Sequence, residues 1–329
     1  MKIVFILEGS DLSGGAKVVL DQAQELSRRG WDVFIVSRED RILWHPMENI
    51  KFIKSADLKD LPEADVGIAT FWTTVIPAFE SGKFKKLFHF CQGYEGSFPP
   101  YENIKKEIDK AYSLPIPKLL IAPYLKKILE EKFSSKTYLL GQFVDRKNFY
   151  PPPKKVFQKP YIFSVVGPYE VDLKGVKDAL KGLKIVKQKY PVRVFRASTF
   201  FITKEEEDLK VVDGFFHHLL PEEMGNFYRR CHFHIQASHR EEGFPLPPLE
   251  AFACKTIPII SDIPSFVDLP FLKFKEGDIQ DLAEKVEVLL KEEDFEVYFK
   301  DYDEIMEEFS IKRVVDRFEN IMKEEFNSP

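Results

Sequence analysis

Short apolar runs alternate with amphipathic stretches along this chain, a pattern typical of a parallel α/β sheet. Residues 3–7 form the first apolar run. Residues 16–29 then have apolar positions at helical spacing, and Gly30 stands where a glycine commonly ends a helix. The same reasoning predicts helices at 103–112 and 124–133. Further strands are predicted at 31–37, 50–53, 66–70, 86–90, 119–122 and 138–140.

A proline-rich segment interrupts this alternation. Pro151, Pro152 and Pro153 follow one another and cannot continue a sheet. The alternation then restarts, with predicted strands at 161–166, 192–197, 211–215, 232–236 and 256–260 and predicted helices at 174–190, 221–231 and 248–254, before an acidic helical tail. We therefore predict two α/β domains, 1–150 and 151–329. Packing of the tail back on the first domain is left open.

Charge is unevenly distributed over these halves. The chain has 48 Lys and Arg against 53 Asp and Glu, a net charge of −5, which sets aside a protein that mainly coats nucleic acid. Residues 1–156 carry a net charge of +4 and residues 157–329 a net charge of −9, and segment 83–136 has 11 basic and 6 acidic residues. A basic face suits an anionic membrane surface or an anionic substrate, while ordinary solvated helix faces explain it equally well.

Composition narrows the class further. Cys91, Cys231 and Cys254 form no CxxC pattern and no disulfide framework, so a reducing cytoplasm is the default, with membrane association left open. No apolar stretch approaches the length of a membrane span, and the N-terminal run is too short for a signal peptide. The 31 phenylalanines indicate a core rich in aromatic packing.

The segment 238–252 has the most chemical content. It follows a predicted buried strand, so it lies at the edge of the sheet where α/β proteins bind ligands. Gly243 and the prolines around it stiffen a loop that leads into a helix, whose free N–H groups would favour a phosphate. Glu242 and Glu250 stand eight residues apart, and carboxylates there can accept hydrogen bonds from sugar or ribose hydroxyls.

The run from Glu242 to Cys254 resembles the E-x7-E signature of retaining glycosyltransferases with the GT-B fold, most closely family 4 (glycosyl transferases group 1). Other blocks fit in register. These are Gly14-Gly15 after the first strand, the 121–127 segment, Gly141–Asp145 with Phe149–Pro151, Val166-Gly167 with Lys174-Gly175, and 213–228. The resemblance spans nearly the whole chain and implies two Rossmann-like, doubly wound domains facing across a cleft, an N-terminal one for the acceptor and a C-terminal one for the donor.

The activity implied by the resemblance is sugar transfer from a nucleotide-diphosphate-sugar, a co-substrate, to a glycan or lipid-linked acceptor in cell-surface polysaccharide synthesis. No metal, no cofactor and no nucleic acid is implied. Glu242 would hold sugar hydroxyls, Gln92 would donate a hydrogen bond to the sugar, and Lys174 would stabilise the diphosphate. The residues expected to contact the donor are Gly14, Gly15, Gly167, Lys174, Ser238, Gly243, Phe244, Pro245, Leu246 and Glu250.

The sequence departs from the family pattern at three places. One is Lys255, which stands after the E-x7-E helix where the family usually has glycine. Pro168 follows Gly167 where the family has an arginine that contacts the diphosphate, so Arg196 or another cation would have to substitute. Gln92, not His89, stands at the place of the family's histidine in the N-terminal domain, which favours a structural role for His89. His217 is a candidate neighbour of the nucleotide base.

Two other functions remain open within the same fold. One is a sugar-nucleotide 2-epimerase, and the other is a non-catalytic partner protein that binds a nucleotide sugar. A dinucleotide-dependent dehydrogenase is disfavoured, because the segment from Glu8 to Gly15 does not fit G-x-G-x-x-G.

Overall fold

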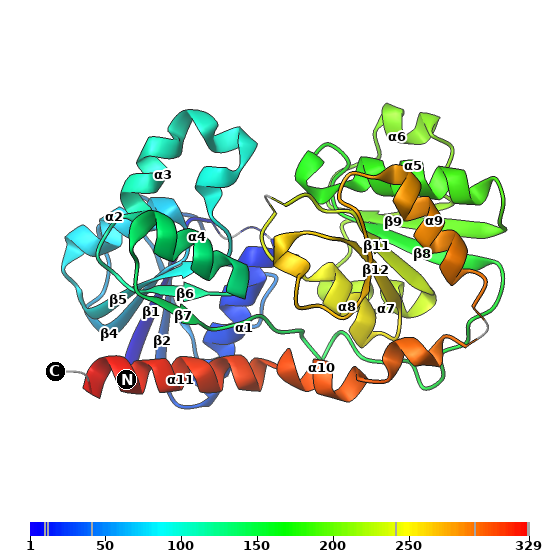
Figure 1. Cartoon of the computed structure of the whole chain (residues 1–329). Helices are drawn as coiled ribbons and strands as arrows, with labels where there is room; N and C mark the ends of the chain where they lie inside the picture. Colours follow the sequence, from blue (N-terminus) through cyan, green and yellow to red (C-terminus); the bar gives the residue numbers. More distant parts are fainter. Residues whose placement is uncertain (10, 12, 41, 241, 293, 328–329) are drawn as a thin grey trace. The chain divides into compact units, whose positions relative to one another are not determined.

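The computed structural model describes residues 1–9, 11, 13–40, 42–240, 242–292 and 294–327. The chain divides into two compact units. Unit 1 comprises residues 1–143 and 309–329, and unit 2 comprises residues 144–308. Each unit contains one sheet against which helices pack (Figure 1).

Unit 1 is built on a seven-stranded sheet in the order β3-β2-β1-β4-β5-β6-β7, with every neighbouring pair parallel. Its strands are β1 (Lys2–Leu7), β2 (Asp32–Ser37), β3 (Lys51–Lys54), β4 (Ala64–Ala69), β5 (Phe84–Cys91), β6 (Lys118–Leu120) and β7 (Thr137–Leu139). Its helices are α1 (Gly14–Arg28), α2 (Trp72–Ser81), α3 (Lys105–Tyr112), α4 (Pro123–Phe133) and α11 (Ile311–Asn327), with 3-10 turns η1 (Glu95–Ser97) and η2 (Pro99–Ile104). The order reverses between β1 and β4, the switch point where such sheets bind ligands.

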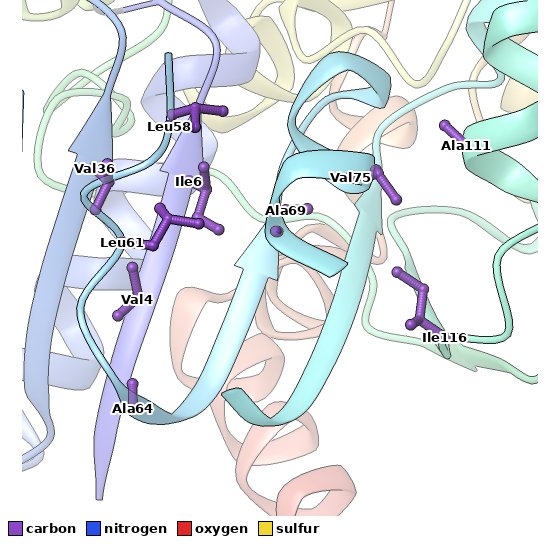
Figure 2. Packing of buried hydrophobic residues seen from close by; sticks show 11 residues of the cluster. Val4, Ile6, Val36, Leu58, Leu61, Ala64, Ala69, Val75, Ala111 and Ile116 are labelled. Atoms are coloured by element: carbon purple, nitrogen blue, oxygen red, sulfur yellow. The ribbon is translucent and has the colours of Figure 1, made fainter. Parts of the chain in front are cut away.

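Aliphatic packing holds α2 and the loop after β3 against this sheet. Figure 2 shows Val4 and Ile6 of β1 beside Leu58 and Leu61, with Val75 of α2 in the same cluster. All five side chains are at most 4% exposed. Burying one such side chain contributes about 1.5–3 kcal/mol. The continuous apolar runs of the sequence are therefore strands covered on both faces.

Unit 2 repeats this design with six parallel strands in the order β10-β9-β8-β11-β12-β13. They are β8 (Tyr161–Val166), β9 (Val192–Ser198), β10 (Gly214–His217), β11 (Phe233–Gln236), β12 (Ile257–Ser261) and β13 (Leu272–Phe274). The helices are α5 (Val176–Lys187), α6 (Lys204–Asp208), α7 (Pro221–Arg230), α8 (Pro247–Ala253), α9 (Ile279–Leu289) and α10 (Tyr302–Glu308), with 3-10 turns η3 (Asp172–Lys174), η4 (Pro264–Phe266) and η5 (Glu296–Phe299). Here the switch point lies between β8 and β11.

The phenylalanine excess serves packing in unit 2. Phe157 stacks on Phe295 with ring centroids 4.7 Å apart, and Phe163 of β8 lies 4.9 Å from Phe233 of β11. Tyr161 contacts the edges of Phe233 and Phe295 at 5.6 and 5.7 Å. Each aromatic pair of this geometry stabilises the fold by about 0.5–1.5 kcal/mol beyond the free energy gained from burying its apolar area.

The first crossing of the chain between the units comes after residue 143, before the predicted boundary at residue 150. Residues 144–150 belong to unit 2 because they pack on α7: Arg229 donates to the carbonyl of Asn148 at 3.2 Å, and Phe149 lies 6.1 Å from the Tyr228 ring. Gly225 of α7 permits this approach, since a Cβ there would lie 2.1 Å from the Asn148 oxygen.

Helix α11 belongs to unit 1, where it runs along α1 (Figure 1). Arg29 donates to Asp316 and Glu319 of this helix at 2.7 and 3.0 Å, and the indole N–H of Trp31 binds Glu319 at 3.1 Å. Further along α11, the mostly buried Glu325 accepts from Lys136, Lys86 and Tyr138. The acidic tail thus neutralises part of the basic excess of the first half.

Candidate functional site

Lys174 and Glu242 meet at the switch point of unit 2. Lys174 ends η3, which follows β8, and Glu242 lies in the loop after the neighbouring strand β11. The ammonium of Lys174 donates to Oε1 of Glu242. Glu242 is only 6% exposed, and its Oε2 is buried without a hydrogen-bond partner among the described residues. We call Lys174, Glu242 and Glu250 together the unit 2 site.

A glycine and one backbone hydrogen bond bring the two side chains together. Gly175 has φ +61°, and a Cβ there would lie 1.7 Å from the carbonyl oxygen of Ala237, so only glycine fits between η3 and the end of β11. The N–H of His239 donates to the carbonyl of Leu173 at 3.0 Å. The Lys-Gly dipeptide is therefore the local reason that the cation reaches Glu242.

Arg196 holds the loop at Gly167 through hydrogen bonds of its guanidinium. Its guanidinium donates to the carbonyl of Gly167 at 2.9 Å and to Glu206 at 2.6 Å, and the residue is fully buried. Gly167 itself has φ +120°, and its N–H binds the Ala197 carbonyl. Arg196 is thus not placed to contact a ligand, and the expectation that it substitutes for the missing diphosphate arginine is wrong for this arrangement. Sequence reasoning missed Glu206. Its buried ion pair with Arg196 is the reason that the guanidinium is directed into the interior of unit 2.

Glu250 lies in the first turn of α8 and is half-buried. Burial of Tyr228 is the main cause that raises the pKa of its hydroxyl, and the negative charge of Glu250 is the next. The two side chains are therefore neighbours. The helix offers fewer donors to a phosphate than its position suggests. Pro247 and Pro248 have no N–H, and the N–H of Glu250 already binds the Leu246 carbonyl at 3.0 Å.

The remaining loop residues are placed unequally. Ser238 is fully buried: its hydroxyl accepts from Gln236 at 2.6 Å and its carbonyl from Ser261 at 2.5 Å, so it supports the loop from inside. Gly243, Phe244 and Leu246 are half-buried and Pro245 is buried. These four residues form the part of the loop that runs from Glu242 to the start of α8.

Gln92, Gly14 and Gly15 lie in unit 1, at the carboxyl edge of its sheet. The amide of Gln92, just after β5, donates to the Gly15 carbonyl at 3.1 Å. Both glycines lie at the start of α1, and neither has a positive φ. Gly15 instead makes room, since a Cβ there would lie 3.2 Å from the Gln92 nitrogen, whereas Gly14 is exposed with nothing within 4 Å.

His89 and Cys91 of β5 are fully buried. Burial, together with the nearby charge of Lys118, lowers the pKa of His89 well below its ordinary value, and burial raises that of the Cys91 thiol. The two ring nitrogens of His89 have no hydrogen-bond partner among the described residues. Neither side chain is accessible to a substrate, which agrees with the structural role favoured for His89.

Sequence reasoning also missed a polar cluster at the carboxyl edge of the unit 1 sheet. Glu8 follows β1 and accepts from Arg38, which follows β2, at 2.9 Å, and from Thr73 in the first turn of α2. The signal that could have found it is the position of each residue just beyond a strand. His217 similarly ends β10 in unit 2, where its ring stacks on the exposed Phe201 at 4.1 Å.

A hollow of about 700 Å³ lies elsewhere in unit 2, lined by Phe157, Tyr161, Tyr190 and Phe295 among others. Tyr161 begins β8, so this hollow is at the amino end of the strand, opposite to the edge where parallel sheets bind ligands. Within the described ranges, no three His, Cys, Asp or Glu side chains are grouped to hold a metal ion. None of the helices described there has the length and apolar character needed to cross a membrane.

Comparison with known proteins supplies the context for this geometry. Residues 147–306 match the family described as Glycosyl transferases group 1. No curated protein matches the sequence. Among solved structures, the sucrose-phosphate synthase of Thermosynechococcus elongatus has 14% identity and a TM-score of 0.80, with 99% of each chain covered. Anabaena HepE in complex with UDP-glucose has 11% identity and a TM-score of 0.80, covering 98% of this chain and 100% of that one.

The lipopolysaccharide outer core galactosyltransferase WaaB has 18% identity and a TM-score of 0.72, covering 99% of this chain and 100% of that one. At such identities the likeness establishes the fold alone. The two parallel α/β sheets are those of a GT-B fold, as predicted.

Proposed function

Since residues 147–306 belong to the glycosyl transferases group 1 family, a retaining one, this chain is a glycosyltransferase, and we propose that its acceptor is a glycan or glycolipid. We propose further that the reaction contributes to a cell-surface or exported polysaccharide. The observation that carries the donor side of the proposal is the pairing of Lys174 with Glu242 at the switch point of unit 2. A cation and an almost fully buried carboxylate at that edge suit a phosphorylated sugar.

In this proposal each residue of the unit 2 site has one task. Lys174 binds the diphosphate and stabilises the negative charge that develops as the sugar departs. Glu242 accepts a hydrogen bond from a sugar hydroxyl through Oε2, the atom that has no partner among the described residues. Glu250 accepts from the ribose hydroxyls. Gly167, Gly243, Phe244, Pro245 and Leu246 complete the contacts around the donor.

The unit 1 residues are proposed to act on the acceptor side and near the transferred sugar. Gln92 keeps its amide fixed on the Gly15 carbonyl and offers its second N–H to the sugar. The acceptor hydroxyl attacks on the face from which the nucleoside diphosphate leaves, and a departing phosphate oxygen takes the hydroxyl proton. The new bond joins the acceptor oxygen to the anomeric carbon while the bond from that carbon to the phosphate oxygen breaks.

A UDP-sugar is the first donor to test, because the structurally similar HepE binds UDP-glucose. A glycan acceptor is supported in the same way by the likeness to a lipopolysaccharide core galactosyltransferase. A thermal-shift screen with UDP-, GDP-, dTDP- and ADP-glucose will identify the base, since a ligand that binds the folded protein raises its melting temperature. Incubation with donor alone would reveal an isomerised sugar if the chain were an epimerase.

Two substitutions test the assignment of the site. Lys174→Ala and Glu250→Ala should each lower turnover, the first by about a hundredfold because it removes a charge that stabilises the transition state. Lys177→Ala is the matched control: this lysine lies in the next helix and pairs with the exposed Asp172. Unchanged turnover in both site variants would contradict the proposal, and an equal loss in the control would show an unspecific effect.

Peripheral contact with an anionic membrane is proposed for a narrower surface than the sequence suggests. Most lysines of 83–136 are in ion pairs, for example Lys136 with Glu325. Lys106, Lys110 and Lys127 are exposed and have no ion-pair partner among the described residues, and Ile104 beside them is 37% exposed. Vesicles with anionic lipid should bind the protein at low salt, and Lys106→Glu/Lys110→Glu should abolish that binding. Binding that is equal on neutral vesicles would refute this surface.

The three reduced, buried cysteines fit a cytoplasmic location.

A further inference from the structure

The cation proposed to bind the diphosphate is already neutralised in the free protein. Lys174 donates to Glu242, and the Glu242 side chain is 8% exposed while that of Lys174 is 35% exposed. The neighbouring charges are engaged elsewhere: His239 lies 3.2 Å from Asp178, and Arg240 binds Glu276 at 2.7 Å. A diphosphate that approaches Lys174 therefore meets a carboxylate that holds the same ammonium group.

This arrangement opposes a bare nucleoside diphosphate. Its phosphates must share Lys174 with Glu242. As they weaken the Lys174–Glu242 ion pair, the buried carboxylate of Glu242 loses the positive charge that offsets its desolvation. A nucleoside diphosphate also has roughly one more negative charge at pH 7 than the corresponding nucleotide sugar, because its terminal phosphate is no longer esterified. This extra charge is attracted by Lys174 and repelled by the Glu242 carboxylate, so the sharing of Lys174 is the effect that weakens binding.

An intact donor answers the same problem. Its sugar carries hydroxyls that donate hydrogen bonds, and Oε2 of Glu242 is a buried acceptor with no partner in the described part of the chain. A hydroxyl bound there compensates the carboxylate for the contact that Lys174 gives up to the diphosphate. Hydrogen bonds to charged groups are stronger than those between neutral ones, so the sugar contributes substantially.

We propose that Glu242 makes the site discriminate between the nucleotide sugar and the nucleoside diphosphate that remains after transfer. Lys174 exchanges partners: it binds Glu242 in the free protein and the diphosphate in the donor complex. Once the sugar has gone to the acceptor, the carboxylate has lost its hydroxyl donor, and re-formation of the Lys174–Glu242 pair favours release of the product. This inference rests on the proposed function and specifies the selectivity of its donor site for the nucleotide sugar over the nucleoside diphosphate.

Binding constants for UDP-glucose and UDP, measured by calorimetry on the full chain, test the inference. If the thermal-shift screen selects another base, the glucose conjugate and nucleoside diphosphate of that base are used. The wild-type protein should bind UDP-glucose roughly tenfold more tightly than UDP. Glu242→Gln keeps the shape but removes the charge, so UDP should bind at least about fivefold more tightly to it and the ratio should fall toward one. A ratio within one variant is insensitive to a partial loss of folded protein.

Asp172→Asn is the matched control, because it removes one negative charge from η3, where Asp172 is exposed and pairs with Lys177. Its ratio should remain that of the wild type. A Glu242→Gln ratio equal to the wild-type ratio, or weaker binding of UDP to this variant, overturns the inference while leaving the proposed donor intact. Failure of every nucleotide sugar to bind the wild-type protein overturns the proposed function itself. Glu242→Ala provides a second variant if the glutamine protein does not fold.

Discussion

Replacing Gly175 by alanine would test how the chain holds Lys174 against Glu242. The backbone there has φ +61°, a region that costs an L-residue about 1–2 kcal/mol. In addition, the new Cβ would lie 1.7 Å from the Ala237 carbonyl oxygen, which is backbone and cannot rotate away. Either η3 or the end of β11 must move, and we expect a total destabilisation of about 3–4 kcal/mol.

Gly277→Ala separates the two contributions. Gly277 has φ +70° in the same unit, and a Cβ there would meet nothing within 4 Å, so only the backbone cost applies. For a unit of about 165 residues, each kcal/mol lowers the melting temperature by about 2–4 °C. Differential scanning calorimetry should therefore show a drop for Gly175→Ala that is at least about 4 °C larger than for Gly277→Ala.

The same proteins give a functional measurement. Gly175→Ala should also weaken binding of UDP-glucose at temperatures where the variant is folded, because Lys174 is the adjacent residue and moves with the turn. Gly277→Ala should bind as the wild type does. Equal melting temperatures for the two variants would refute the argument from close approach, and unchanged donor binding in Gly175→Ala would show that the turn does not position Lys174.

Three further predictions concern other parts of the structure. Arg196→Leu should destabilise unit 2 by about 3–5 kcal/mol, measured by chemical denaturation, because it leaves its carboxylate partner buried and uncompensated; a loss below about 1 kcal/mol would contradict this. Burial raises the pKa of Glu95 to about 7, so wild-type stability should fall as the pH rises from about 4.5 through 7, by up to roughly 3 kcal/mol relative to Glu95→Gln; parallel pH profiles of the two proteins would refute it. Gly15→Ala should displace the Gln92 amide by a few tenths of an ångström and lower turnover, whereas Gly14→Ala, where a Cβ meets nothing within 4 Å, should retain it in the same assay.

The sequence predicted the elements whose signals are local. The run 161–166 and the strand Tyr161–Val166 coincide, because a run that is apolar except for Ser164 is typical of a strand buried on both faces. Helix α2 was not predicted. Its sequence is rich in β-branched and aromatic residues and contains Pro77, so intrinsic propensity disfavours a helix that tertiary packing nonetheless stabilises. Strand β13 was missed because three residues carry too little periodicity.

The site divides along the same line. Lys174 and Glu242 were both found from motifs, but only the structure shows that they bind each other, because the contact joins residues 68 positions apart. The direction of Arg196 was equally inaccessible. Its position in a strand does not reveal whether the guanidinium points at a ligand or into the core, and its partner Glu206 lies in a helix that the sequence did not predict.

The division of the chain into units has a consequence for the order of events during synthesis. Unit 2 is one continuous stretch, so all of its residues are available once position 308 has left the ribosome. Unit 1 is interrupted, and its early residues Arg29 and Trp31 have partners on α11, which follows all of unit 2 in the chain. The first unit to begin translation is therefore the second to be completed. Until α11 has been synthesised, the side chains of Arg29 and Trp31 that bind it must remain hydrated or be shielded by a chaperone.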